Sequence, residues 1–77
     1  MTDKTKFMDV VNNSGKKIYE VASALGMSHQ TFYNKLANVS DFTAPEMVAF
    51  RKLFPEVTDE MFQEIFFAKE LAVTPNE

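Results

Sequence analysis

The sequence predicts an all-α protein, a compact five-helix bundle, and two observations carry that prediction. Apolar residues recur at helical spacing in five segments, whereas no stretch keeps the alternation of apolar and polar residues that marks a strand. The segments are separated by glycines, prolines and residues that favour helix ends. The 77 residues are 45% apolar and include eight phenylalanines, which is enough for a single domain over residues 1–77 with one core.

The N-terminal half is expected to form three helices. In chain order they should cover residues 4–12, 17–25 and 28–36. The first helix ends where Gly15 can adopt the left-handed conformation of a C-terminal cap. Gly26 should interrupt the second helix in the same way, and Ser28 is a favourable N-cap for the third.

The C-terminal half predicts two further helices, at residues 44–54 and 58–72, followed by a tail over residues 73–77. Thr43, Pro45 and Glu46 have the types and spacing of an N-cap, an early proline and a capping-box glutamate. Pro55 then ends the fourth helix. Thr58 is a second capping threonine, and two acids follow it in the first turn of the fifth helix.

Composition narrows the classes of function. The chain has no cysteine, which excludes disulfides, thiolate metal sites and cysteine nucleophiles. It has one histidine and no glycine-rich phosphate loop, so we expect no catalytic site, no metal, no cofactor and no small-molecule substrate. No apolar run approaches the roughly 20 residues of a membrane span, and the first residues lack the apolar stretch of a signal peptide. We therefore expect a soluble cytoplasmic protein that is not an enzyme.

Charge is distributed unevenly along the chain. The net charge is −3, but residues 1–40 carry five lysines against three acids, and residues 41–77 carry three basic residues against eight acids. This asymmetry is expected of a protein that presents one face to DNA and the other elsewhere. Acidic residues that only keep a small protein in solution would give the same distribution.

Residues 18–36 meet the steric requirements of a helix-turn-helix. Ala22 is small where the second helix would cross the first, and Gly26 suits the positive φ of the turn. Phe32 and Leu36 lie one turn apart and can anchor the second helix in the core. Each condition is weakly specific, but all are met in register.

Two stretches of the chain resemble the Xre/Cro/phage-repressor helix-turn-helix family. They are VASALGMSHQTFYNKL, residues 21–36, and FPEVTDEMF, residues 54–62. The resemblance extends over roughly residues 5–72 and implies a DNA-binding domain of the phage-repressor type, with a central helix-turn-helix and a recognition helix at residues 28–36. It implies a regulator of the lysogenic/lytic switch that binds operator DNA in a bacterial host cell, similar to Cro-like proteins or modulators of repression in phages of Gram-positive hosts.

The resemblance also implies roles for individual residues. Base contacts are expected from the early residues of the recognition helix, namely Ser28, His29, Gln30, Tyr33 and Asn34. Phosphate contacts are expected from Lys16, Lys17, Lys35, Asn38, Ser40 and Thr43. Gln30 and Asn34 suit bidentate hydrogen bonding to adenine. The chain departs from the family at Ile18, where a polar residue, often glutamine, usually binds a phosphate.

The fifth predicted helix indicates a protein partner. Its apolar residues cover more of its circumference than one core-facing stripe requires, so a remainder should be exposed unless the core surrounds this helix on both sides. The predicted partner surface consists of Phe62, Phe66, Phe67 and Leu71. It could join two copies in a homodimer that reads two half-sites, or bind the phage repressor. The alternative function is therefore an antirepressor that binds the repressor, with weak or no independent DNA binding.

Overall fold

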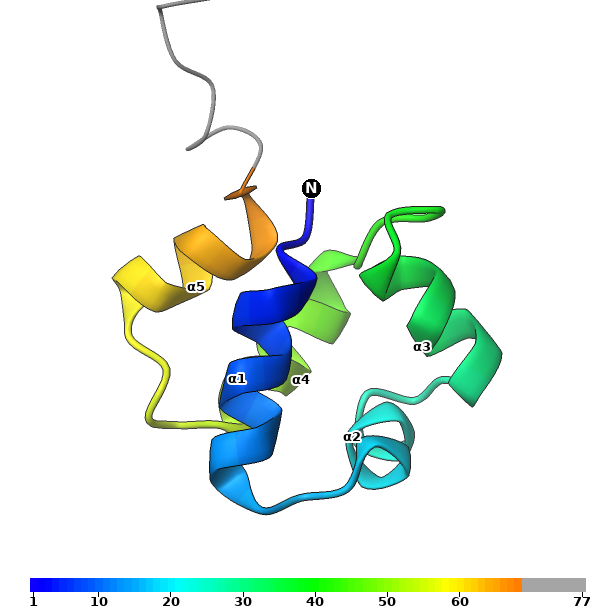
Figure 1. Cartoon of the computed structure of the whole chain (residues 1–77), viewed down its shortest axis with the longest axis horizontal. Coiled ribbons are helices and arrows are strands. Elements are labelled where there is room, and N and C mark those ends of the chain that lie inside the picture. Colours follow the sequence, from blue (N-terminus) through cyan, green and yellow to red (C-terminus); the bar gives the residue numbers. More distant parts are fainter. Residues whose placement is uncertain (69–77) are drawn as a thin grey trace, which may run out of the picture.

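The computed structural model describes residues 1–68, and that part of the chain forms five α-helices and no strand (Figure 1). The helices are α1 (Lys4–Ser14), α2 (Ile18–Ala24), α3 (His29–Leu36), α4 (Ala44–Leu53) and α5 (Asp59–Phe66). The predicted all-α class and the predicted order of five helices are confirmed. Figure 1 shows α1 in the middle of the view, with α5 on its left and α2 and α3 on its right.

The core is built on phenylalanine side chains that meet around Phe7 of α1. The Phe7 ring is fully buried, and its centroid lies 4.7–5.9 Å from the centroids of four other phenylalanine rings. These four are Phe32 of α3, Phe42 of the α3–α4 connection, Phe50 of α4 and Phe66 of α5. One ring of α1 therefore joins three other helices, and its truncation to alanine should cost about 3–5 kcal/mol.

Local capping signals determine most helix boundaries. Ser28, Thr43 and Thr58 are the N-caps of α3, α4 and α5, and each side-chain hydroxyl accepts a hydrogen bond from the backbone N–H three residues later. Glu46 completes the predicted capping box by accepting a hydrogen bond from the backbone N–H of Thr43 at 2.9 Å. Gly15 has φ 79° at the end of α1, as predicted, although this helix extends two residues further than expected.

The fifth helix has a break that the sequence did not predict. It was expected over residues 58–72, but it ends at Phe66, and the next residue leaves helical geometry at φ −125° and ψ 37°. The N-terminal segment, residues 1–3, binds the last carbonyls of this helix. The Asp3 N–H donates to the Ile65 carbonyl at 2.7 Å, and the Met1 ammonium donates to the Phe66 carbonyl at 3.4 Å. These carbonyls would otherwise accept hydrogen bonds from the next helical turn.

The same N-terminal segment also contacts the end of α3. The backbone N–H of Thr2 donates to Oδ1 of Asn38 at 2.8 Å, and Nδ2 of Asn38 donates to the Thr2 carbonyl at 3.0 Å. Asn38 has φ 65°, the left-handed conformation that ends many helices. Residues 1–3 therefore connect the C-terminal ends of α3 and α5. The predicted helical turn beyond residue 68 and the tail over 73–77 lie outside the described residues.

None of the described helices is long and apolar enough to cross a membrane.

Candidate nucleic-acid interface

The connection between α2 and α3 is a tight turn centred on Gly26. This residue has φ 78°, and its N–H donates to the Ser23 carbonyl at 2.9 Å. The N–H of Met27 donates to the Ala22 carbonyl at 3.0 Å. The pair of hydrogen bonds is a Schellman motif, which satisfies the last carbonyls of α2 and requires a left-handed residue at this position. The positive φ predicted for Gly26 is confirmed.

Helix α3 divides cleanly into a buried and an exposed face. Phe32 and Leu36 are buried in the core, as predicted. The five residues predicted to contact bases, Ser28, His29, Gln30, Tyr33 and Asn34, are all exposed. Gln30 and Asn34 lie on the helix face opposite the core-facing side chains, whereas His29 and Tyr33 lie at its edge, closer to the core-facing side. The helix therefore presents hydrogen-bonding side chains on a face that its own domain does not use.

An aromatic row on the surface joins α2 to α3. The ring centroids of Tyr19 and His29 are 6.5 Å apart, and those of His29 and Tyr33 are 6.2 Å apart. Tyr19 and Tyr33 are 53% and 46% exposed. Tyr19 was not among the predicted site residues. The sequence could have indicated it, because Tyr19 is a large aromatic residue outside the core-facing stripe of its helix. A side chain at such a position lies on the surface.

The structure does not support the phosphate contact predicted for Lys35. Its side chain is 11% exposed, and its ammonium donates to both carboxylate oxygens of Glu46, at 2.7 and 2.9 Å. Burial by itself raises the pKa of the Glu46 carboxyl, but hydrogen bonds from Lys35 and Thr43 and the Lys35 charge together hold that pKa below its usual range. The cation is therefore neutralised inside the domain, where it ties α3 to the first turn of α4.

The structure gives Asn38 a role in the fold. Its side-chain amide is half-buried and is paired with the backbone of Thr2, as described above. Thr43 is exposed, but its hydroxyl caps α4 by accepting from the Glu46 N–H at 3.3 Å. Thr43 therefore stabilises the start of α4, and Asn38 connects the end of α3 to the N-terminal segment.

Three of the predicted phosphate-contacting residues remain available on the surface. Lys16, Lys17 and Ser40 are exposed. Lys16 and Lys17 immediately precede α2, where Glu20 accepts a hydrogen bond from the Lys17 backbone N–H at 2.8 Å. An acidic side chain therefore accompanies the two lysines. The candidate interface combines hydrogen-bonding side chains and aromatic rings with few free cations.

Comparisons found no match. No protein-family model, curated protein or solved structure matches the chain, so neither its family nor its function follows from a relative.

The predicted partner surface on α5 is smaller than expected. The prediction that Phe66 lies on the surface is wrong, because this residue is 2% exposed and its ring packs against other core phenylalanines. Phe62 and Phe67 are half-buried, with ring centroids 6.2 Å apart. The Arg51 guanidinium lies 5.2 Å from the centroid of the Phe62 ring. Leu71 lies outside the described residues.

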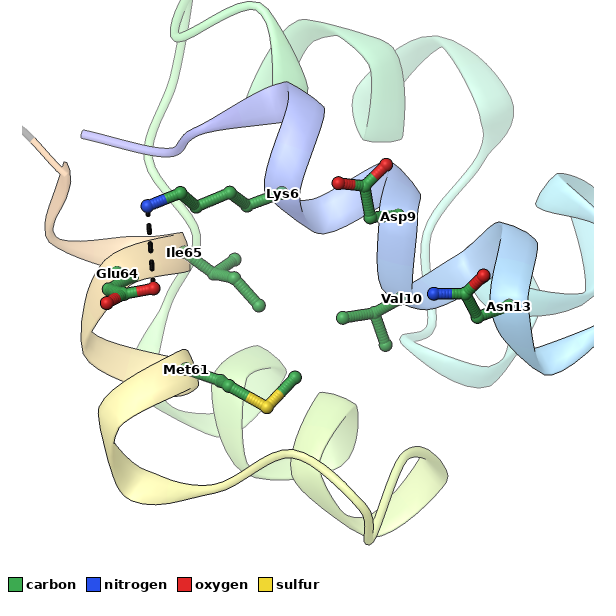
Figure 2. Close-up of a pocket in the computed structure, with 7 residues that line it drawn as sticks. All are labelled: Lys6, Asp9, Val10, Asn13, Met61, Glu64 and Ile65. Atoms are coloured by element: carbon green, nitrogen blue, oxygen red, sulfur yellow. Dashed lines mark hydrogen bonds and ion pairs between the residues drawn. The ribbon is translucent and has the colours of Figure 1, made fainter.

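A shallow groove of about 210 Å³ lies between α1 and α5 (Figure 2). Val10, Met61 and Ile65 give it an apolar floor. The Lys6 ammonium and a Glu64 carboxylate oxygen are 3.4 Å apart across one end, and both side chains are about half exposed. The described part of the chain contains no group of three or more His, Cys, Asp or Glu side chains that could hold a metal ion.

Proposed function

We propose that this protein is a transcription regulator that binds duplex DNA through the exposed face of α3. One observation carries the proposal. The Schellman turn at Gly26 and the Ser28 cap set the start of α3, and Phe32 and Leu36 anchor it, so that its polar face is left for a partner. A recognition helix in the major groove uses its first residues in this way. The resemblance of residues 21–36 to the phage-repressor family supports the same function.

Two amides on this face suit adenine. Gln30 and Asn34 are exposed and lie four residues apart on α3, so both side chains face the same direction. A glutamine or asparagine amide can donate to adenine N7 and accept from its N6 amino group, and such a pair is worth about 1–3 kcal/mol of discrimination. We expect the preferred duplex to contain adenines at the positions that these two residues meet.

Free positive charge limits the electrostatic part of binding. Because Glu46 neutralises Lys35, Lys16 and Lys17 are the lysines near α3 that we expect to neutralise phosphates. For B-DNA, a plot of the logarithm of the binding constant against the logarithm of the salt concentration has a slope of about −0.9 for each neutralised phosphate. With two lysines, a slope of about −2 is expected. The protein should therefore depend more on its base contacts than a strongly basic DNA-binding domain does.

The test is selection of duplexes from a random-sequence pool, followed by fluorescence anisotropy titrations at several salt concentrations. Asn34→Ala should reduce the preference for the selected duplex over the pool, whereas Lys17→Ala should weaken binding to both and make the salt slope shallower. Lys52→Ala is the matched control, because Lys52 is an exposed lysine on α4 outside the predicted contacts. Failure to enrich any sequence, or binding that salt does not change, would contradict the proposal.

A second candidate function is an antirepressor that binds a helix-turn-helix repressor protein. The pairing of Lys35 with Glu46 favours this function, because it removes a free cation from α3. The half-buried rings of Phe62 and Phe67, in the acidic half of the chain, also favour it. Phe67→Glu should then abolish capture of the phage repressor in a co-purification assay. Val48→Glu, which changes an exposed valine on α4, should leave capture intact. Equal capture by both variants would contradict this function.

A further inference from the structure

We propose that Tyr19 of α2 is a positioning residue of the candidate interface. Its ring holds the His29 ring in place at the start of α3, and through His29 it contributes to the base preference of the protein. The inference rests on the proposed DNA-binding function and adds to it a residue from the other helix of the unit.

The position of Tyr19 does not follow from core packing. Its neighbours Ile18 and Val21 pack in or against the core, whereas the Tyr19 side chain is 53% exposed. Its ring centroid lies 6.5 Å from that of His29, with the ring planes at 53°. Tilted aromatic pairs with centroids 4.5–7 Å apart attract one another through their quadrupoles as well as through buried area. The exposed ring therefore has a surface partner across the turn.

His29 has two aromatic neighbours. It is the first residue of α3, where side chains of a recognition helix meet base edges. Besides Tyr19, the Tyr33 ring also lies near it, with the His29 and Tyr33 ring centroids 6.2 Å apart and their planes at 69°. An exposed side chain at a helix start otherwise keeps several rotamers, and fixing one on binding costs affinity. Two neighbouring rings reduce that cost for the rotamer they favour.

The residue before Tyr19 explains why α2 uses this position. Ile18 begins α2 where the resembled family usually has a polar residue, but its side chain packs against the core. It offers no hydrogen bond to DNA or to α3. The next residue, Tyr19, is turned about 100° around the helix axis and reaches the surface beside His29. The contact from α2 to the first residue of α3 is therefore aromatic in this chain.

Two variants separate the ring from its hydroxyl. Tyr19→Leu removes the ring, and Tyr19→Phe keeps it. The titrations compare the duplex selected by the wild-type protein with a duplex altered at the base pair nearest to His29. The ratio of the two affinities should be roughly 2- to 10-fold smaller for Tyr19→Leu than for the wild type. Tyr19→Phe should restore it. Thermal unfolding midpoints of both variants should match the wild type, because the side chain is exposed.

A spectroscopic readout tests positioning independently of DNA. In the free protein, NMR should show cross-peaks between the ring protons of residue 19 and His29 in the wild type and in Tyr19→Phe. The His29 ring-proton shifts should change in Tyr19→Leu. Unchanged His29 shifts would overturn the inference, as would equal loss of discrimination in both variants, which would point to the hydroxyl.

The two failures are distinguishable. If the wild-type protein selects no duplex, the proposed function fails and the role of Tyr19 in base preference fails with it. If the wild type selects a duplex and Tyr19→Leu discriminates as well as the wild type, this inference alone is wrong.

Discussion

Replacing Glu46 with glutamine tests how α3 is fixed to the rest of the domain. The change keeps the shape of the side chain and an oxygen that can accept the Thr43 N–H, but it removes the negative charge. The Lys35 ammonium, which now donates to both Glu46 oxygens at 2.7 and 2.9 Å, would then lie in a site with no carboxylate. The variant therefore measures the ion pair with little disturbance of the helix cap.

The expected loss of stability follows from burial. The Lys35 and Glu46 side chains are 11% and 19% exposed, so solvent screens the pair less than a surface pair but more than a fully buried one. Charged hydrogen bonds contribute about 1.5–3 kcal/mol, and breaking a fully buried pair costs about 3–5 kcal/mol. We expect a loss of about 2–3 kcal/mol, a large part of the stability of a small domain. The melting temperature should fall by on the order of 10 °C or more.

Urea and thermal unfolding followed by circular dichroism measure this loss. Glu56→Gln is the matched control, because Glu56 is exposed and its loss should change the free energy of unfolding by less than about 0.5 kcal/mol. A double variant, Lys35→Met with Glu46→Leu, should recover much of the loss, since two apolar side chains leave no unpaired charge. A Glu46→Gln variant as stable as the control would refute the reasoning.

The same pair predicts a pH dependence. The folded-state pKa of Glu46 is depressed, so its contribution to stability is fully present above the unfolded-state pKa, about 4.3, and is lost as the pH falls through the folded value. Wild-type and Glu46→Gln stabilities should therefore differ most near neutral pH and converge in acid. A difference that stays constant from neutral pH into acid would show that the carboxylate charge does not stabilise the fold.

Three further substitutions test the local devices of the fold. Gly26→Ala should cost about 1 kcal/mol, because φ 78° strains an L residue even though a Cβ there meets no atom within 4 Å, and Gly26→Asn should cost less in the same unfolding assay. Asn38→Ala should cost about 1–2 kcal/mol and speed hydrogen exchange at Thr2, and unchanged exchange would rule out the pairing of these residues. Thr58→Ala should cost about 1 kcal/mol by removing the α5 cap, whereas Thr58→Ser should restore it.

Local features of the chain were predictable from sequence. The caps at Ser28, Thr43 and Thr58 and the left-handed glycines depend on residues within a few positions, so pattern and spacing suffice to find them. The exposed face of α3 follows in the same way from the periodicity that buries Phe32 and Leu36. These predictions need no knowledge of the tertiary arrangement.

Features that depend on contacts distant in sequence were not predictable. Lys35 has the sequence signature of a solvated cation, and only the packing of α4 on α3 brings Glu46 within 2.7 Å. Phe66 belongs to the core because Phe7, 59 positions away, lies at the centre of the domain, with the ring centroids 5.9 Å apart. The α5 helix ends where residues 1–3 bind its carbonyls, a contact between opposite ends of the described chain.

The central claim is that α3 presents a DNA-binding face, and chemical-shift mapping tests it most directly. The backbone NMR resonances of the free protein would be followed on titration with the duplex selected from a random pool. The account predicts the largest shift changes at His29, Gln30, Tyr33 and Asn34, with smaller changes at Lys16 and Lys17. Changes confined to α5 around Phe62 and Phe67, or no changes at a saturating concentration of duplex, would contradict it.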